Sequence, residues 1–540
     1  MNSTAQYFIK KPIVILLAVN ILIGLFIFRD YGLSWDEPYF YSYGDALGYA
    51  YSPANWFGGN FDLNNSYGAS GEDHKTRGPA YLLLARNFVY GVEALGADSA
   101  SAWHLVNFLF FQLGIYFLYR LAKRWMKVPA AFAAAALFSY QPLLWGHAFI
   151  NPKDPPFLTF FLASICLGFE MVDMLTDNSL ARKQKTMQVI FPAVLLGITT
   201  SIRVLGPLAG LLIFVYLVWQ VFQNKDTVQF GSPWIFFIFY VGLAIVTMLA
   251  TWPFLWGNPV SRFVDVFRLM SDNPTNLSVL FGGVIYRAGE LPRRYLPVML
   301  ATTLTEPVWI LFVVGLFATI WKYLKNKSSV LKNNQGDLVS LSLMFFWFVI
   351  LLAYVLIRRP SMYDGFRHFL FILPPVFIFV GMAFEYILEK INRIQTIENY
   401  WIHAVLIVAF ISPGLVGIFR LHPYEYTYYN SFVGGTNGAF RNYETEYWLT
   451  CYKDAVEQLN KTSTAPINLF VKREAYIAAT YANKNINVRD LRGETDQVKS
   501  GDYVLINTRT NEDKSTFKNA PTIIQIKRGN ATFCIVRQTP

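Results

Sequence analysis

Two adjacent carboxylates, Asp36 and Glu37, lie in an aromatic-rich stretch, 31–41, directly after the first apolar segment of the chain. At the end of a hydrophobic span, near the membrane surface, the local dielectric constant is lower than in water. A lower dielectric constant can shift the pKa values of carboxylates and suit them to proton transfer. The pair could equally form a solvated turn in which Asp36 caps a surface helix. Asp36 and Glu37 are therefore candidates for general acid–base chemistry, with a helix cap as the alternative.

A third acid, Asp154, lies in the segment Asn-Pro-Lys-Asp-Pro-Pro at 151–156. It could cap the helix that the two prolines begin. The alternation of spans places it on the same membrane face as Asp36 and Glu37, so it could also belong to one site with them.

Arg203 has apolar sequence on both sides, and it belongs either to a broken helix or to a short turn between two spans. An ionisable group at membrane depth is costly and usually faces a cavity or a partner. In both arrangements the guanidinium lies near the outer membrane surface, where it can pair with a phosphate in a two-pronged geometry that lysine cannot match.

A basic cluster at 358–368 ends with Arg367 and His368. The alternation of spans places this loop on the outer face of the membrane, where the positive-inside rule disfavours arginine. Binding of a lipid phosphate would account for the excess. Arg203, Arg367 and His368 are therefore candidates for a phosphate site.

Membrane-spanning helices must position these groups. The chain is 54% hydrophobic, 17% aromatic and only 15% charged, against about 25% charged residues in soluble domains. The apolar runs long enough to cross a hydrocarbon core of about 30 Å predict an all-α polytopic membrane protein with about eleven transmembrane helices. These runs are 12–28, 103–119, 130–147, 156–174, 188–202, 204–222, 233–252, 298–320, 339–357, 367–388 and 401–420.

Basic residues cluster in every second loop, and short loops rich in Lys and Arg stay in the cytoplasm. This pattern predicts a cytoplasmic N-terminus and, with an odd number of spans, a C-terminus outside the cytoplasm. The net charge of +11 is largely explained by these loops, so no nucleic-acid partner is expected. The basic groups are Lys10 with Lys11, 120–127, 182–185, Lys225, 322–332 and Lys390 with Arg393.

Two domains are expected: a transmembrane domain, 1–420, and a soluble extracytoplasmic domain, 421–540. The first external loop, 29–102, is too long for a simple connector. It contains an amphipathic segment, 81–95, which the charge pattern places at the membrane interface rather than across it. A helical pattern at 451–459 and three β-rich runs predict a small α/β unit in the soluble domain. The β-rich runs are 467–471, 503–506 and 522–526.

The chain has three cysteines. Cys166 falls in an apolar run, whereas Cys451 and Cys534 fall in the external domain, where an oxidising compartment would permit a disulfide. Unpaired thiols are nevertheless expected. The sequence contains no CxxC motif and no His/Cys cluster that would predict a structural zinc site.

Taken together, the candidate motifs resemble those of the C-type (GT-C) superfamily of membrane glycosyltransferases. The resemblance is closest to the bacterial relatives of protein O-mannosyltransferases and of aminoarabinose transferases, and it covers the whole membrane part. The motifs that carry it are Trp35-Asp36-Glu37-Pro38, the segment 151–156, Arg203-Val204-Leu205-Gly206 and the run 367–375.

This resemblance implies an inverting glycosyltransferase, expected in the bacterial inner membrane. It would move a hexosyl or pentosyl sugar from a polyprenyl-phosphate donor to an extracytoplasmic acceptor, which is left open between a protein, a lipid and a glycan. A carboxylate would deprotonate the acceptor hydroxyl as it attacks the anomeric carbon, while the phosphate leaves from the opposite face. The implied roles are Asp36 as base, Glu37 as a supporting or metal-related group, and Arg203, Arg367 and His368 as phosphate ligands.

Some relatives in this superfamily bind a divalent metal ion between acids of the first and second external loops. Asp154 could contribute to such a site here. One matching acid does not define a coordination shell, so metal dependence is left open.

The alternative function is a membrane transporter or flippase of a lipid-linked or anionic substrate. In such a protein, intramembrane arginines and external acids line a path and no bond is made. The clustering of the candidate groups on one face, and the lack of two half-chains with matched broken helices, favour the enzyme.

Overall fold

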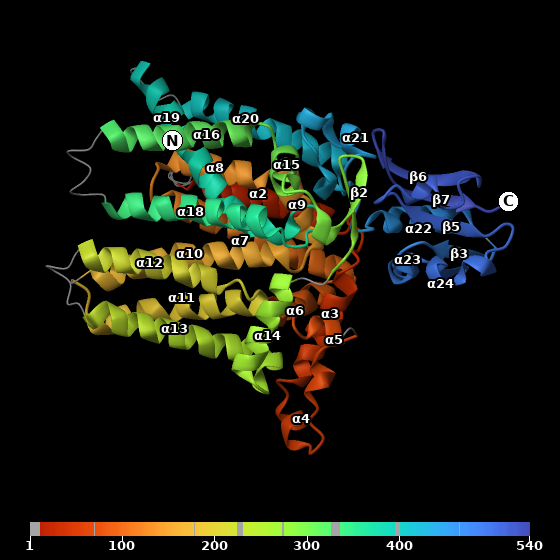
Figure 1. Cartoon of the computed structure of the whole chain (residues 1–540), viewed down its shortest axis with the longest axis horizontal. Coiled ribbons are helices and arrows are strands. Elements are labelled where there is room, and N and C mark those ends of the chain that lie inside the picture. The colour runs from red at the N-terminus through yellow and green to blue at the C-terminus, as the bar shows by residue number, and fades with distance from the viewer. Residues whose placement is uncertain are drawn as a thin grey trace.

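The computed structural model describes residues 11–69, 71–177, 179–223, 231–272, 275–325, 335–394, 400–463 and 465–540. Long helices run side by side and form the body of the molecule, and the C-terminal domain lies at one end of them (Figure 1). Lys10, Lys225 and residues 326–332, on which the predicted topology partly relies, lie outside the described residues.

Eight helices of the described chain are long and apolar enough to cross a membrane. A ninth span would be formed by α8 (Val128–Ser139) and α9 (Pro142–Ile150), which are bent by 62° at the break between them. The eight helices are α7 (Ser99–Ala122), α10 (Asp154–Thr176), α11 (Arg182–Ile202), α13 (Gly231–Thr251), α16 (Pro307–Lys325), α18 (Gln335–Arg358), α19 (Leu373–Ile394) and α20 (Tyr400–Leu421).

Two further apolar helices are short. α2 (Pro12–Ile27) has 16 residues and α12 (Pro207–Gln223) has 17. At 1.5 Å per residue they reach only about 24–26 Å, against a hydrocarbon core of about 30 Å. The predicted apolar runs are mostly helical, but the predicted count of eleven spans is not confirmed.

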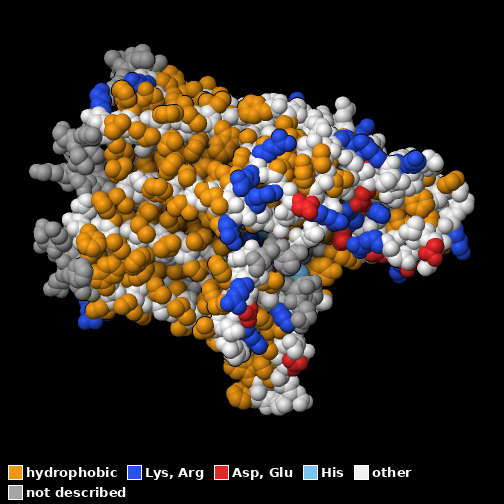
Figure 2. Space-filling model, viewed as in Figure 1, with side chains coloured by type: hydrophobic (Ala, Val, Ile, Leu, Met, Phe, Trp, Pro, Cys, Tyr) orange, Lys and Arg blue, Asp and Glu red, His pale blue; other side chains and the backbone are white. Residues whose placement is uncertain are grey.

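α10 and α19 form the centre of the bundle. Buried residues make up 83% of the apolar window of α10 and 89% of that of α19, against 17% for α13. Hydrophobic side chains cover the bundle on the face shown in Figure 2, whereas Lys, Arg, Asp and Glu gather over its end and over the C-terminal domain. An exposed apolar surface of this extent is that of an integral membrane protein.

Short helices and a β-hairpin cover the end of the bundle next to the C-terminal domain (Figure 1). The amphipathic segment predicted at 81–95 is a helix of 15 residues, α6, and is not among the eight candidate spans. The antiparallel hairpin of β1 (Ser278–Phe281) and β2 (Val284–Arg287) has no counterpart in the sequence prediction. The helices of this layer are α3 (Glu37–Ala46), α4 (Pro53–Phe57), α5 (Gly71–His74), α6 (Ala80–Ala94), α14 (Pro259–Asp272), α15 (Tyr295–Thr303) and α21 (Gly435–Ala439).

The C-terminal domain is built on a five-stranded mixed sheet in the order β4-β3-β5-β7-β6. β3 pairs in parallel with β4 and β5, and β7 pairs antiparallel with β5 and β6. The predicted helix and the three predicted strands are confirmed as α22, β3, β5 and β6. The elements are α22 (Cys451–Thr462), β3 (Ile467–Val471), α23 (Ala475–Tyr481), β4 (Ile486–Asp490), α24 (Leu491–Glu494), β5 (Tyr503–Asn507), β6 (Thr522–Arg528) and β7 (Ala531–Gln538).

A disulfide joins Cys451, at the start of α22, to Cys534, in β7, and the two Cα atoms are 6.0 Å apart. The expectation of unpaired thiols at these positions is therefore wrong. The two cysteines are separated by 83 residues in the sequence, so only the packing of α22 on the sheet brings them together. Cys166 is a free, buried thiol inside α10.

Candidate active site

Asp154 is held at the first residue of α10 by the loop before it. The Oδ1 atom of Asn151 accepts hydrogen bonds from the backbone N–H groups of Lys153, at 3.1 Å, and of Asp154, at 2.9 Å. The Nδ2 atom of Asn151 donates to Oδ2 of Asp154 at 2.9 Å. The N-cap position of α10 is Lys153 rather than Asp154, so the Asp154 carboxylate is available for other partners.

Arg203 lies in a break between two separate helices, because α11 ends directly before it and α12 starts at the fourth residue after it. The first external loop touches this break at Gly78. A Cβ atom at Gly78 would not fit beside the carbonyl oxygen of Ser201. This close approach brings Arg77 to the neighbourhood of Arg203.

Arg367 is the centre of the cluster that these elements form. Its Nη2 lies 3.1 Å from Oδ2 of Asp36, its Nη1 3.3 Å from Oδ2 of Asp154, and its Nε 3.2 Å from Oδ2 of Asp364. Arg203 pairs with the other oxygen of Asp154. The structure therefore brings together Asp36, Asp154, Arg203 and Arg367, four of the residues predicted from the sequence.

Asp36 is the accessible acid of this cluster. It occupies the N-cap position of α3, but its side chain makes no capping hydrogen bond. It pairs with Arg367 instead. The Asp36 side chain is 29% exposed and that of Asp154 only 2%, so a bound molecule can reach Asp36 more easily.

Glu37 is not part of this cluster. Its fully buried carboxylate accepts hydrogen bonds from the backbone N–H of Ser34, at 2.5 Å, and from the hydroxyl of Tyr41. The Nε2 atom of His104, in α7, lies 3.0 Å from it. A buried carboxylate needs such partners, and through them Glu37 fixes the first external loop on the bundle.

His368 follows Arg367 in the short 3-10 helix η5 (Arg367–Ile372). Its ring packs edge-on against Tyr363, with ring centroids 4.8 Å apart. Among the described residues no hydrogen bond joins the His368 ring to Asp36 or Asp154. A role of His368 in phosphate binding stays a prediction.

Two further basic residues, Arg77 and Lys153, contribute to the charge of this cluster. The sequence analysis gave them no role. Lys153 is 7% exposed, its Nζ lies 5.5 Å from the centre of the Phe40 ring, and it has no ion pair within the described part of the chain. Burial lowers the pKa of Lys153 well below its ordinary value, and repulsion from Arg77 and Arg203 adds to this. The pKa of Arg203 is lowered to about 9. Burial is the largest cause, and repulsion from Arg367 and Arg77 adds to it.

Arg203 and Arg367 therefore contact the two acids Asp36 and Asp154, and the basic residues Arg77 and Lys153 lie near these arginines. The remaining acid that contacts Arg367, Asp364, is shared with another arginine of the C-terminal domain. An anion bound among these cations would relieve their mutual repulsion. The cluster is thus a site with an electrostatic preference for a negatively charged ligand.

The C-terminal domain covers this cluster. The guanidinium of Arg367 lies 4.9 Å from the centre of the Trp448 ring. Arg509, which follows β5, pairs with Asp364 at 2.7 Å and with Glu444 at 2.9 Å. Burial raises the pKa of both Asp364 and Glu444, and the charge of Arg509 opposes this shift.

The first external loop is attached to the C-terminal domain by its backbone. The hydroxyl of Tyr476 donates to the carbonyl of Trp35 at 2.6 Å, and the N–H of Leu33 donates to the hydroxyl of Tyr481 at 2.8 Å. Gly32 lies so close to the turn before α22 that no Cβ would fit there. These partners are more than 400 residues away in the sequence, and no local pattern identifies them.

Within the described chain, the loop acids Asp36 and Asp154 do not belong to a group of three potential metal ligands. Asp36 and Asp154 are bridged by the guanidinium of Arg367. The one group of three potential ligands in the described chain is Glu446 with Cys451 and Cys534, whose sulfur atoms form the disulfide. A divalent ion between the loop acids stays a prediction.

The sequence matches no protein-family model and gives no significant match to a curated protein. The solved structure of the archaeal oligosaccharyltransferase AglB from Archaeoglobus fulgidus, in complex with an inhibitory peptide and a dolichol-phosphate, matches 95% of this chain and 71% of its own. The TM-score is 0.53 and the sequence identity 10%. The apo form of the Archaeoglobus fulgidus oligosaccharyltransferase matches 94% of this chain and 70% of its own, with a TM-score of 0.52 and 11% identity. The chain has the GT-C fold of membrane glycosyltransferases.

The apo structure of ArnT from Cupriavidus metallidurans matches 99% of this chain and 98% of its own, with a TM-score of 0.49 and 14% identity. At such low identities the similarity concerns the GT-C fold alone. The chemistry of this GT-C chain is therefore argued from its own residues.

Proposed function

We propose that this chain is an inverting glycosyltransferase that uses a polyprenyl-phosphate sugar donor and an extracytoplasmic acceptor, in the bacterial inner membrane. The observation that carries the proposal is the cluster of Arg77, Lys153, Arg203 and Arg367 at the end of the membrane bundle. One guanidinium group can donate two parallel hydrogen bonds to two oxygens of a phosphate. A lipid-linked phosphate can approach this end of the bundle from the bilayer. The dolichol-phosphate in the AglB complex belongs to the same class of lipid.

Asp36 is proposed as the catalytic base. Its carboxylate is the accessible acid of the cluster and is paired with Arg367 at 3.1 Å. A donor phosphate that binds Arg367 competes with Asp36 for the guanidinium. Donor binding would therefore release the Asp36 carboxylate from this ion pair at the moment when a sugar is present.

The proposed reaction is a single displacement at the anomeric carbon. The acceptor oxygen attacks this carbon and its proton passes to Asp36, while the bond from the anomeric carbon to the phosphate oxygen breaks and the phosphate keeps the electron pair. Attack from the face opposite the phosphate inverts the configuration. Lys153, Arg203 and Arg367 stabilise the negative charge that develops on the leaving phosphate.

The proposal is tested by incubating the purified full-length protein with radiolabelled sugars on polyprenyl phosphates and with extracts of cell-envelope acceptors. We expect that one donor is consumed, that free polyprenyl phosphate is released, and that the label enters an acceptor. A different result would support transport: the donor binds but is never consumed, and proteoliposomes move it across the membrane. That result would contradict the proposed transfer.

A further inference from the structure

A cavity of about 360 Å³ lies between α16 and α19, at the end of the bundle opposite the C-terminal domain. It is far from the cluster around Arg367, which lies at the other end of α19. The cavity is lined by Ala318, Trp321, Lys322, Lys325, Met382, Glu385, Tyr386, Glu389 and Lys390.

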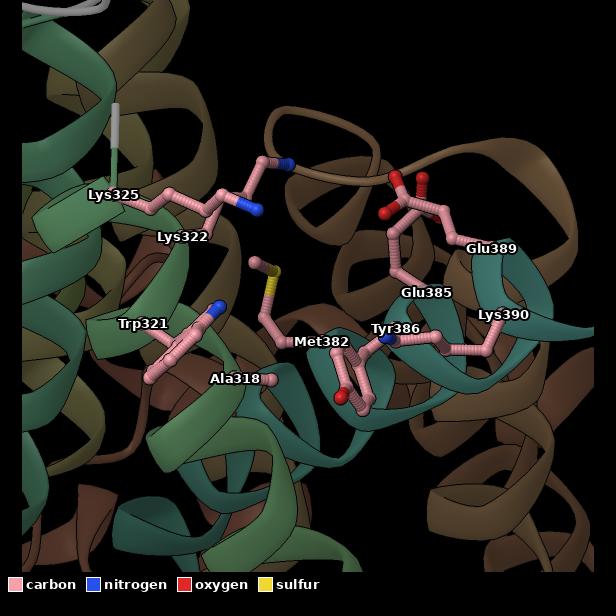
Figure 3. A pocket seen from close by; sticks show the side chains of 9 residues that line it. All are labelled: Ala318, Trp321, Lys322, Lys325, Met382, Glu385, Tyr386, Glu389 and Lys390. Atoms are coloured by element: carbon pink, nitrogen blue, oxygen red, sulfur yellow. The ribbon is translucent and has the colours of Figure 1, made fainter. Parts of the chain in front are cut away.

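Four of the five charged groups of this cavity are grouped by sign on two facing walls. Figure 3 shows the amines of Lys322 and Lys325 on one wall and the carboxylates of Glu385 and Glu389 on the facing wall. In the described chain no ion pair joins the two walls. Glu385 is buried, and its Oε2 accepts a hydrogen bond from the backbone N–H of Lys127 at 3.0 Å. The cavity thus offers cations and anions that no ion pair of the described chain joins across it, and the third lysine, Lys390, lies beside Tyr386 on the wall of the glutamates.

The floor of the cavity is apolar and aromatic. Met382 is buried, whereas Trp321 is 67% exposed and Tyr386 is exposed. Exposed Trp and Tyr side chains next to lysines are typical of the head-group level of a bilayer. The basic end of α16 faces the cytoplasm in the predicted topology, which puts the cavity at the inner leaflet.

We propose that this cavity binds the head group of an ethanolamine phospholipid of the inner leaflet. The lipid phosphate would pair with Lys322 and Lys325, and its ammonium would donate hydrogen bonds to Glu385 and Glu389. A purely anionic head group would be repelled by the two carboxylates. A choline head group has no N–H group with which to donate a hydrogen bond to them. The volume corresponds to roughly twelve water molecules at about 30 Å³ each, which is sufficient for the eight or so non-hydrogen atoms of this head group.

The test is native mass spectrometry of the purified full-length protein titrated with dioleoyl phosphatidylethanolamine, phosphatidylcholine or phosphatidylglycerol. We expect the ethanolamine lipid to bind roughly fivefold more tightly than either of the others, as for one or two interfacial ion pairs. Equal affinity for the three lipids in the unmodified protein would overturn the proposal.

Variants separate the two walls. Glu385→Gln with Glu389→Gln should abolish the preference over phosphatidylglycerol, and Lys322→Met with Lys325→Met should weaken binding of all three lipids. The amide oxygen of Gln can still accept the N–H of Lys127, and the single Glu389→Gln variant serves if the double variant does not fold. An exposed lysine outside the cavity provides the control, because Lys183→Met should leave the preference unchanged. An effect of Lys183→Met equal to that of the cavity variants would show a general surface attraction and contradict the site.

Discussion

Lys153 is the side chain whose surroundings point most directly to a ligand. It is buried beside Arg77 and Arg203 with no ion pair in the described chain, and an unpaired buried cation costs free energy of folding. Lys153→Met should therefore leave the melting temperature of the donor-free protein unchanged or raise it. The same variant should weaken binding of a polyprenyl phosphate by about 10–100-fold, because a charged hydrogen bond to the phosphate is lost.

Arg203→Met is the matched control for this prediction. It removes a cation that is paired, and it leaves the buried Asp154 with one partner fewer. This variant should lower both the melting temperature and the donor affinity. If Lys153→Met lowers the melting temperature as much as Arg203→Met does, Lys153 is a structural residue rather than a phosphate ligand.

The sequence predicted Asp36, Asp154, Arg203 and Arg367 because each is an ionisable residue beside apolar sequence. The residue types alone could not separate Asp36 from Glu37, and only the family resemblance gave them different roles, since neighbouring residues at the start of a helix point in directions about 100° apart. One carboxylate of this pair faces Arg367 and the other is buried against His104. Arg509 and Trp448 reach the cluster from the C-terminal domain, and no local pattern marks them.

At the scale of elements, His422 connects the end of α20 to the first external loop. Its Nε2 lies 2.9 Å from Asp30 and its Nδ1 2.8 Å from Glu425. Burial opposes its protonation, but the hydrogen bonds and charges of Glu425 and Asp30 outweigh burial and raise the pKa of His422. The stabilisation is therefore complete below the ordinary histidine pKa of about 6.5 and is lost as the pH rises through the folded-state value.

Asp30→Asn should accordingly lower the melting temperature by about 1–3 °C near pH 6 and change it little near pH 9. Differential scanning fluorimetry of the detergent-solubilised protein at both pH values measures this difference. An equal loss at both pH values would show that the charge of His422 does not contribute to the connection.

The elements themselves were predictable where their pattern is local and long. The apolar runs of α7, α10 and α19 and the β-rich runs of β3, β5 and β6 correspond to elements of the structure. β4, with the sequence Ile-Asn-Val-Arg-Asp, is too polar to be recognised and forms because β3 pairs with it. α2 and α12 are shorter than the eight candidate spans, and for this reason the predicted count of eleven spans is not confirmed.

At the scale of the whole molecule, the arrangement predicts which end faces the cytoplasm. Single cysteines at Asn60, in the exposed first loop, and at Lys183, at the start of α11, lie at opposite ends of the bundle. The native cysteines are buried or in the disulfide. A membrane-impermeant maleimide added to spheroplasts should label Asn60→Cys directly and Lys183→Cys only after permeabilisation. The reverse pattern would place the candidate site in the cytoplasm.

The central claim is that this site forms a glycosidic bond and that Asp36 takes the acceptor proton. Asp36→Asn keeps the size of the side chain and removes its basicity, and Glu37→Gln makes the same change at the neighbouring buried position. The measurement is sugar transfer from a polyprenyl-phosphate donor, together with donor affinity, for both variants and the unmodified protein. We predict that Asp36→Asn lowers turnover by about 10²–10⁴-fold and retains donor binding, whereas Glu37→Gln lowers stability more than turnover. Unchanged turnover in Asp36→Asn would contradict the account.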